Sequence, residues 1–437
     1  MSRTLINNTI TIIVPKRSNR LDFVCRFIFH EILGLNYRIE EAQIDEYKLS
    51  FQKHQYNQFY SGFIAQGSEI NKDGLSIEQD GSIPFFRSSE GKKYTFQEDL
   101  FAYVFFFLSR YEEYHFNHKD QYGRINSANL LSVKSRCHEI PLVDHKIREF
   151  GLELERLFGI QTQQHKPQYR SSFDVDHAWK YQHKGLLRNA GGMAKDLLLL
   201  NISGVIERLK VLLGAKVDPY HSFEEIDQFH KKTVNPIFFF LMGKYGGIDI
   251  NIAPRNIHFL TFLRKFAKDH DIGIHPSYRS NQKPNNLIEE KNLLEDAVGR
   301  KIISSRQHFL ILNFPDSYRA LLESNISHDY SMGFHDKVGF RAGTAHSFLW
   351  YDLQQEIETS LRIHPFVAMD VSMRDYLQLT PQEAQDKLEI IWKSMALTGG
   401  EMMTIWHNNS FIDGENWFKW KSVLVWLSEL RHNNSNT

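Results

Sequence analysis

The chain has 437 residues, which is too long for one ordinary domain and predicts two or three. Hydrophobic residues make up 42% and charged residues 24%, a composition typical of soluble globular proteins. Lysine plus arginine and aspartate plus glutamate both number 52, and this neutral balance gives no support for nucleic-acid binding.

The cysteine content and the composition of the first residues predict a cytoplasmic location. It has two cysteines, Cys25 and Cys137, and such a low content is typical of a reducing compartment. The first twenty residues are polar and lack the apolar core of a secretion signal. No stretch approaches the roughly 20 apolar residues that a spanning helix needs.

Residues 1–165 predict a small mixed α/β domain. Residues 8–14 alternate and are rich in β-branched side chains, which favours a strand. Helices are expected at 21–33, 99–113 and 142–158, where apolar residues recur with helical spacing. A polar stretch, 161–168, reads as a linker, and nothing in this domain points to chemistry.

From residue 168 to about 430 the pattern changes to alternating strands and helices. Strands are expected at 171–175, 236–242, 272–275, 302–306, 366–370 and 402–406, and helices at 256–268, 289–298 and 381–396. Such alternation predicts an α/β fold, either a parallel sheet or an α/β barrel. In both architectures the chemistry collects at the carboxyl ends of the strands.

Residues 183–216 interrupt this alternation with a leucine-rich, basic segment. It carries six lysines or arginines against two acids, Asp196 and Glu207. A segment of this kind could make peripheral contact with an anionic membrane. The alternative, which the pattern favours more, is a pair of amphipathic helices packed on the domain.

Two acids, Asp174 and Asp176, end the first strand of this second region. Residues i and i+2 of a strand point the same way, so both carboxylates share one face. Carboxylates this close repel one another, and a metal ion or a shared proton is the usual remedy.

Three further residues follow predicted strands. His275 ends the strand 272–275, and a neutral imidazole there suits Zn²⁺ or another borderline divalent ion, although a structural histidine is the commoner case. Arg306 could pair with a carboxylate and hold it ionised as a base, or form a plain salt bridge. His308 could be a metal ligand.

His407 follows the strand 402–406, and its imidazole could donate a proton to a leaving group. Trp406 and Trp179 offer flat faces to a ligand, although core packing is the more ordinary use of tryptophan. The glycine- and aromatic-rich stretch 329–344, which contains Arg341, could approach a ligand closely or be a plain connecting loop. We expect Trp406, Trp179, Arg341 and Tyr278 to contact the substrate.

Several other chemistries are excluded. The chain contains no GxSxG elbow, no Walker A loop, no GxGxxG and no CxxC. His30-Glu31 begins like a zincin helix, but Gly34 occupies the position of the second histidine.

Taken in order, six motifs resemble those of the NodB-homology polysaccharide deacetylases, carbohydrate esterases with a distorted (β/α) barrel. They are Phe-Asp-Val-Asp at 173–176, Phe-Phe-Phe at 238–240, Gly-Ile-His-Pro-Ser at 273–277, Ser-Arg-Gln at 305–307, Pro-Phe-Val-Ala-Met-Asp at 365–370 and Ile-Trp-His at 405–407. The resemblance covers about residues 168–412. It is closest to a divergent branch from Bacteroidetes-type bacteria, whose N-terminal domain has segments like 105–114 and 120–124.

The resemblance implies roles for the site residues. It makes Asp174 the general base, Asp176 and His275 metal ligands, and His407 the general acid. It also makes Arg306 the residue that orients the base, with Trp406 lining an acetyl pocket. The family's second metal histidine belongs four residues after His275, where this chain has Arg279. Either His308 substitutes for it, or the metal site is weakened or lost.

The implied activity is metal-dependent hydrolysis of an N-acetyl group on a carbohydrate or glycan precursor, with Zn²⁺ as the expected ion and Co²⁺ or Ni²⁺ as alternatives. Two other hypotheses stay open. The chain could be a catalytically silent glycan-binding or polysaccharide-assembly module, or a metal-independent amide hydrolase. The substrate, the oligomeric state and the role of residues 1–165 are not given by the sequence.

Overall fold

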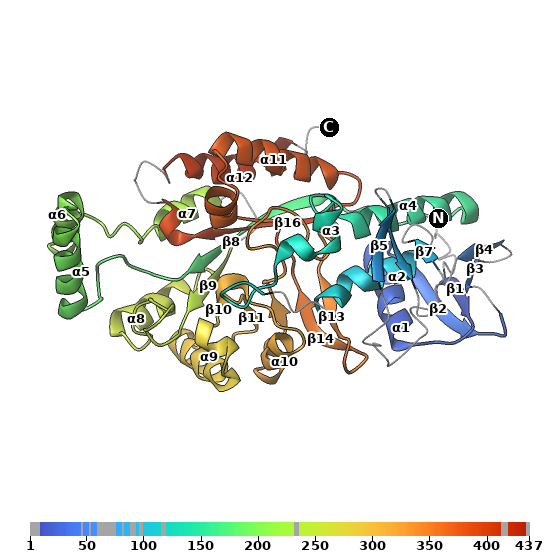
Figure 1. Ribbon diagram of the computed structural model, residues 1–437, viewed down its shortest axis with the longest axis horizontal. Coiled ribbons are helices and arrows are strands. Elements are labelled where there is room, and N and C mark those ends of the chain that lie inside the picture. Colours follow the sequence, from blue (N-terminus) through green and yellow to red (C-terminus); the bar gives the residue numbers. More distant parts are fainter. Residues whose placement is uncertain are drawn as a thin grey trace, which may run out of the picture.

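The computed structural model describes residues 9–44, 47–51, 54–58, 76–80, 83–87, 93–95, 99–114, 119–230, 236–411 and 418–433. These residues form an α/β protein with a large, mainly parallel sheet at its centre (Figure 1). An N-terminal region lies at one end of this sheet, and a helical hairpin projects at the opposite end.

The described part of the N-terminal region has two small sheets and four α-helices. The strands of the first sheet are β1 (Thr9–Val14), β2 (Asn36–Glu41), β3 (Tyr47–Phe51) and β4 (His54–Gln58), in the order β2-β1-β3-β4. The second sheet has β5 (Ser76–Asp80), β6 (Ile83–Arg87) and β7 (Lys93–Thr95). The helices are α2 (Leu100–Leu108), α3 (Leu131–Lys134) and α4 (Leu142–Phe158), and α1 (Asn19–Cys25) continues as a π-helical segment, Arg26–Ile32.

Helix α4 has the bounds that its apolar spacing predicts. Ile147, Phe150, Leu154 and Phe158 form its buried face. The helix ends where Gly159 adopts φ 66°, a left-handed conformation that glycine reaches without steric cost.

The central sheet is built from the second region of the chain. Its strands are β8 (Pro167–Val175), β9 (Ile237–Leu241), β10 (Asp271–His275), β11 (Ser304–Ser305), β12 (His328–Asp329), β13 (Phe348–Asp352), β14 (Ile357–Ile363), β15 (Ala368–Met369) and β16 (Gly400–His407). Their order is β13-β14-β12-β11-β10-β9-β8-β16-β15, and every neighbouring pair is parallel except β13 and β14. This arrangement confirms the α/β fold and the parallel sheet.

Helices cover both sides of the sheet (Figure 1). On one side lie α8 (Ile257–Phe266), α9 (Pro284–Val298) and α10 (Asp316–Glu323). On the other side lie α7 (Phe223–His230), α11 (Pro381–Ser394) and α12 (Lys421–Asn433). Helix α11 begins with a capping box between Thr380 and Glu383, which satisfies its first backbone donors.

Alternate side chains along a strand of the central sheet point to opposite faces and pack in different apolar clusters. On β16, Met403 and Ile405 pack in a small cluster with Phe239 of β9, whereas Met402 and Trp406 belong to the main core. Since successive side chains of a strand point to opposite faces, His407 lies on the face of Met403 and Ile405. Register pairs His407 with Asp174 across β16 and β8, which brings the ends of both strands together.

The segment 357–369 connects β14, near one edge of the central sheet, with β15 at the other edge. Strand β14 pairs with β12, and β15, a few residues later, pairs with β16. Between them His364 N–H donates to Asp329 O at 2.8 Å, and Val367 N–H donates to Met403 O at 2.8 Å. The segment 357–369 therefore contacts β12 with one part and β16 with the other.

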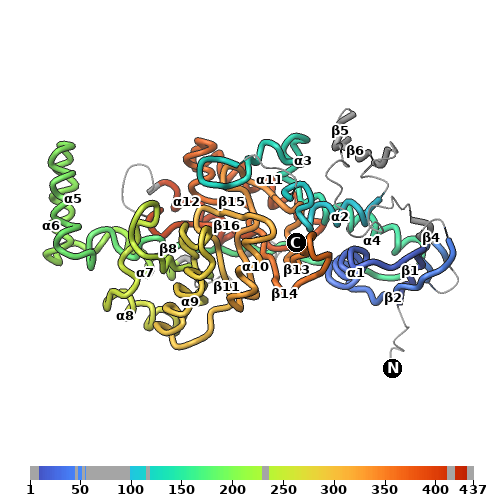
Figure 2. Tube along the Cα trace, turned by 60° about the horizontal axis from the view of Figure 1, so that its bottom comes forward, coloured from blue at the N-terminus to red at the C-terminus, as the bar shows by residue number. Residues whose placement is uncertain are grey.

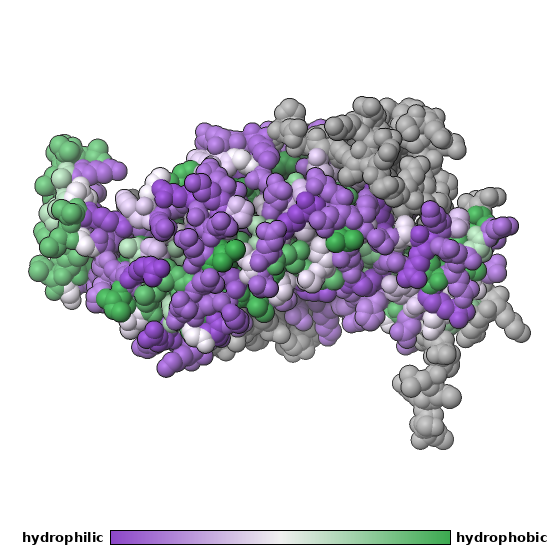
Figure 3. Space-filling model, turned by 90° about the horizontal axis from the view of Figure 1, so that it is seen from below, coloured by the Kyte–Doolittle hydropathy of each residue, from purple (hydrophilic) through white to green (hydrophobic). Residues whose placement is uncertain are grey.

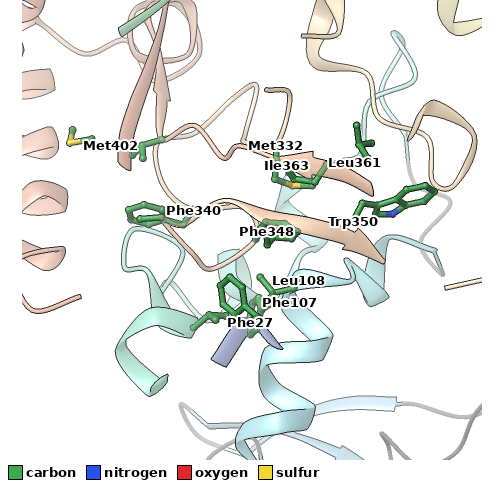
Figure 4. Packing of buried hydrophobic residues seen from close by; sticks show 14 of the residues in the cluster. Phe27, Phe107, Leu108, Met332, Phe340, Phe348, Trp350, Leu361, Ile363 and Met402 are labelled. Atoms are coloured by element: carbon green, nitrogen blue, oxygen red, sulfur yellow. The ribbon is translucent and has the colours of Figure 1, made fainter. Parts of the chain in front are cut away.

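The N-terminal region shares a core with the sheet. Figure 4 shows Phe27, Phe107 and Leu108 beside Phe348 of β13, and all belong to one cluster of buried apolar side chains. Sequence patterns do not predict this shared core, because the contacting residues lie more than 200 positions apart.

Buried polar contacts join the same two parts. Glu113 binds Arg110 at 2.6 Å and Arg341 at 2.5 Å. Asp144 of α4 accepts hydrogen bonds from Thr344 Oγ1 at 2.5 Å and Ala345 N–H at 2.7 Å.

The segment 183–216 forms the expected helical pair, α5 (Leu186–Leu198) and α6 (Ile202–Leu212). The expectation that the pair packs on the domain is wrong. The hairpin projects from the end of the molecule in two views (Figures 1 and 2), and Leu187 and Leu198 are 90% and 84% exposed.

Two expectations bear on location. Within the described ranges, the chain has no helix with the length and apolar character needed to cross a bilayer. Cys25 and Cys137 are both free thiols.

Candidate active site at the carboxyl ends of the strands

Asp174 and Asp176 meet at the end of β8, as their spacing predicts. Both face the imidazole of His275: its Nε2 lies 4.0 Å from Asp174 Oδ2 and 3.4 Å from Asp176 Oδ1. Asp174 is buried, whereas Asp176 is partly open to solvent. The two carboxylates therefore border one small volume from the same strand end.

Arg306 holds Asp174. Its Nη1 donates to Asp174 Oδ1 at 2.9 Å, and its Nε donates to Tyr330 O, also at 2.9 Å. The guanidinium lies 4.4 Å from the ring centroid of Phe239 and is fully buried. Burial lowers the pKa of Arg306, and the charge of Asp174 opposes that shift. The pair fixes one carboxylate oxygen of Asp174 and leaves the other facing His275.

Asp176, His275 and His308 can hold a metal ion: their ligand atoms all lie within 4.8 Å of one another. Asp176 Oδ1 is 3.4 Å from His275 Nε2 and 3.7 Å from His308 Nε2. A tetrahedral ion with bonds of about 2.0–2.1 Å separates its ligands by about 3.3 Å. The separations of Asp176 from the two histidines are thus close to the spacing that such an ion requires.

Hydrogen bonds orient both histidines for coordination. His275 Nδ1 lies 2.6 Å from Arg306 O, an acceptor, so that nitrogen carries the proton and Nε2 presents its lone pair to Asp176. His308 Nδ1 lies 3.0 Å from Asp249 Oδ1, which fixes the same tautomer. A carboxylate behind a ligating histidine is the usual support of a metal site.

Asp249 was missed by the sequence analysis. It is buried, and the same Oδ1 accepts Tyr278 N–H at 2.9 Å. Burial raises its pKa, but the hydrogen bonds and charge of His308 and the backbone donors outweigh burial and lower it. Asp249 lies in the loop after β9, where no strand end or motif marked it.

Asp176 Oδ1 lacks a protein donor. Within the described part of the chain it is a buried oxygen with no hydrogen bond of normal geometry. Burial raises the pKa of Asp176, but the facing imidazoles of His308, His275 and His407 lower it well below its usual value. An ionised oxygen without a donor, between two imidazole lone pairs, fits a cation.

His407 lies on the other side of Asp176, at 3.9 Å between Nε2 and Oδ2. Its Nδ1 is 2.8 Å from Asp370 Oδ1, and its backbone N–H donates to Asp370 Oδ2, also at 2.8 Å. Burial lowers the pKa of His407, but the charges of Asp370, Asp176 and Asp174 outweigh it and raise the pKa to about 10. Asp370, buried at the end of the predicted strand 366–370, was also missed.

Of the residues expected to contact substrate, Tyr278 lies nearest this cluster. It borders Phe309, the neighbour of His308, at 5.9 Å between ring centroids. Tyr122 of the N-terminal region packs on the same Phe309 at 5.1 Å. These three rings form an aromatic rim beside the histidines.

The other three expected substrate contacts lie elsewhere. Trp406 is fully buried, donates to Thr404 Oγ1, and points away from His407 by strand alternation. Trp179 packs among Phe259, Phe262 and His221. The guanidinium of Arg341 is buried against Glu113. The structure does not bring these side chains into the cluster.

A family model described as a family of unknown function (DUF7033) matches residues 10–159, which is the N-terminal region. No curated protein matches the chain.

Among solved structures, the chain is similar to a protein assigned as a polysaccharide deacetylase from Mycobacterium smegmatis, with 14% identity, a TM-score of 0.36, and coverage of 60% of this chain and 82% of that one. The PuuE allantoinase matches at 13% identity and a TM-score of 0.35, covering 61% of this chain and 85% of that one. A polysaccharide deacetylase from Bacillus cereus matches at 11% identity and a TM-score of 0.31, covering 62% and 89%. Because these TM-scores are below 0.5, the function proposed below rests on the side chains of the site.

Proposed function

We propose that this protein is a metal-dependent hydrolase that removes an N-acetyl group from a carbohydrate or glycan precursor. One observation carries the proposal. The possible metal ligands Asp176, His275 and His308 lie beside two side-chain pairs, the buried Asp174 with Arg306 and the partly buried His407 with Asp370. Metal-assisted hydrolysis of an amide uses a metal ion, a general base and a general acid, and this site has a candidate for each role.

Asp176, His275 and His308 would hold the ion, and one carboxylate with two imidazoles suits Zn²⁺, with Co²⁺ or Ni²⁺ as alternatives. When bound there, the ion would supply Lewis-acid polarisation of the acetyl carbonyl and a water of lowered pKa.

Asp174 is the proposed general base. Arg306 binds its Oδ1, so Oδ2 is the oxygen left to accept a proton from the attacking water. The hydrogen bond from the buried guanidinium limits the rotation of the Asp174 carboxylate. Arg306 is thus a positioning residue that holds the carboxylate of the base in a fixed orientation.

His407 is the proposed general acid. Because its Nδ1–H points at Asp370, its Nε2 faces the volume beside Asp176. A proton on Nε2 can pass to the departing amine there. Asp370 fixes the ring and stabilises its charged form, helped by the hydroxyl of Ser410, which donates to Asp370.

The fold fits the proposal if the central sheet is a distorted (β/α) barrel. The segment 357–369 supports this, because it hydrogen-bonds to β12 at one part and to β16 at the other. In such a barrel the strand ends would surround the site. An N-acetylated sugar would then lie over the cluster beside Tyr278, and a cytoplasmic glycan precursor is the proposed source.

A silent binding module is less well supported, because binding alone does not need the buried Asp174–Arg306 and His407–Asp370 pairs. Metal-independent amide hydrolysis would also use the Asp174–Arg306 and His407–Asp370 pairs. It would not explain why Asp176 Oδ1 has no hydrogen-bond donor among the described residues. Activity that survives a chelator would favour that alternative.

The test is metal content by elemental mass spectrometry beside acetate release from N-acetylglucosamine oligosaccharides. We expect about one ion per wild-type chain, lost with activity in His275→Ala and in His308→Ala. His270→Ala is the matched control, because His270 binds Asp227 on another part of the surface. A chain that takes up neither Zn²⁺, Co²⁺ nor Ni²⁺ would refute the metal site.

A further inference from the structure

The hairpin of α5 and α6 presents an apolar face to solvent. On α5, Leu187 and Leu198 are separated by three helical turns and lie on one side. On α6, Ile202, Ile206, Leu209 and Leu213 recur at helical spacing, with exposed fractions of 52%, 47%, 41% and 81%. Figure 3 shows these hydrophobic residues gathered over the projecting end of the molecule. An exposed apolar surface of this extent marks an interaction site.

The turn between the helices is the most apolar part. Leu197 to Leu200 are four consecutive leucines, with exposed fractions of 50%, 84%, 67% and 83%. Leu200 has φ 55°, a left-handed conformation in which glycine or asparagine costs less. The hairpin thus carries a large apolar side chain where a small or polar one would suit the backbone better.

The acids of the hairpin are already paired. Asp196 binds Arg208 at 2.9 Å, and Glu207 binds Lys180 at 2.8 Å and Lys216 at 2.7 Å. Among the residues that the structure describes, Lys184, Lys195 and Lys210 have no carboxylate within ion-pair distance. The hairpin therefore combines an apolar face with cations that lack an anion.

We propose that this hairpin docks the protein on an anionic membrane surface. The leucine face would enter the headgroup–acyl boundary, and the exposed Lys195 and Lys210 would contact lipid phosphates. A second copy of the chain is a poorer occupant, because face-to-face pairing would bring two sets of uncompensated lysines together. Anionic headgroups provide the opposite charge.

Docking would also orient the candidate active site. The hairpin leaves the sheet shortly after Asp176, at the end of β8. A cleft of about 700 Å³ lies along the hairpin, and His177, Lys184 and Arg188 help to line it. Burial and the charge of Arg188 lower the pKa of Lys184 to about 8, which agrees with an excess of cations in this cleft. A docked hairpin would therefore place the edge of the site near the lipid surface.

The experiment is co-sedimentation of the full chain with vesicles of phosphatidylcholine, with or without phosphatidylglycerol. We expect binding to the anionic vesicles that weakens with added salt, and at least about tenfold weaker binding to the neutral ones. The double variant Leu198→Ser/Leu200→Ser should lower binding about tenfold or more. Ile390→Ser/Leu397→Ser, at positions 63% and 73% exposed, is the matched control and should bind like the wild type.

A second pair of variants tests the charge. Lys195→Glu/Lys210→Glu should lose binding to anionic vesicles, whereas Lys265→Glu/Lys268→Glu on and beside α8 should keep it. All four positions are exposed, so circular dichroism should report unchanged folding. Wild-type protein that stays in the supernatant with anionic vesicles overturns the proposal. So does a dimer in sedimentation velocity that the leucine variant dissociates, because the face would then bind a second copy.

Discussion

Replacing Asp249 is the sharpest test of the candidate metal site, because Asp249 contacts only one of the proposed ligands, His308. Its Oδ1 accepts both His308 Nδ1–H, at 3.0 Å, and Tyr278 N–H, at 2.9 Å. Its Oδ2 is buried and has no hydrogen-bond partner among the described residues. Asp249→Asn keeps the shape and both hydrogen bonds through Oδ1 but removes the negative charge. Asp249→Ala removes the acceptor as well.

The two variants should differ in size of effect. Loss of the carboxylate behind a metal-binding histidine typically lowers metal affinity 10- to 100-fold, which corresponds to about 1.4–2.7 kcal/mol. We expect Asp249→Asn to lower metal affinity by about 10-fold, because His308 keeps its tautomer and loses only basicity. Asp249→Ala should lower metal affinity by about 100-fold, because His308 Nδ1 loses its acceptor and the imidazole is free to turn.

The assay is competition for Zn²⁺ against a chromophoric chelator, with circular dichroism to verify folding. Asp227→Asn serves as control, because Asp227 binds the distant His270. Metal affinity of Asp249→Ala within threefold of the wild type would refute the assignment of His308 as a ligand supported by Asp249.

Three further predictions concern catalysis and stability. Asp174→Asn should lower kcat about 10²–10⁴-fold in acetate release while keeping the metal, and a variant that loses the metal instead would contradict its role as base. Glu113→Gln should destabilise the protein by about 3–5 kcal/mol in urea unfolding, because the buried guanidinium groups of Arg110 and Arg341 both lose the charge of Glu113, although Arg110 keeps Glu112 at 3.7 Å. The exposed Glu149→Gln should cost no more than about 1 kcal/mol, and equal losses would contradict this reasoning. Burial raises the pKa of Asp144 from 3.8 to about 7, so the folded state holds a proton that the unfolded chain releases. This contribution is complete below about pH 4 and is lost as the pH rises to about 7, so Asp144→Asn should flatten the fall in unfolding free energy between pH 4 and 7. An unchanged slope in that range would refute the prediction.

Local patterns predicted much of the fold and part of the site. The apolar spacing of residues 142–158 gave the bounds of α4, and the strand ends marked Asp174, Asp176, His275 and His407 before any geometry was known. Alternation along β16 places Trp406 and His407 on opposite faces, so the sequence itself argues against a shared role for the two side chains at the site.

Long-range contacts were beyond the sequence. Asp249 lies in a loop, and only the folded chain brings it to His308. Asp370 ends a predicted strand as clearly as His407 does, so the same signal could have found it. The exposed leucines of the hairpin have the spacing of a helix that packs on a core, and periodicity does not say whether a core is there to receive it.

The contacts of Glu113 and Asp144 make the two parts of this protein depend on each other. A chain beginning at residue 168 would leave Arg341 buried without its anion and Phe348 without Phe27 beside it. We therefore expect that the strand-rich part does not fold alone and that the whole molecule unfolds in one transition. Exchange of either half for a foreign one during evolution would be penalised, so the two halves should be inherited together.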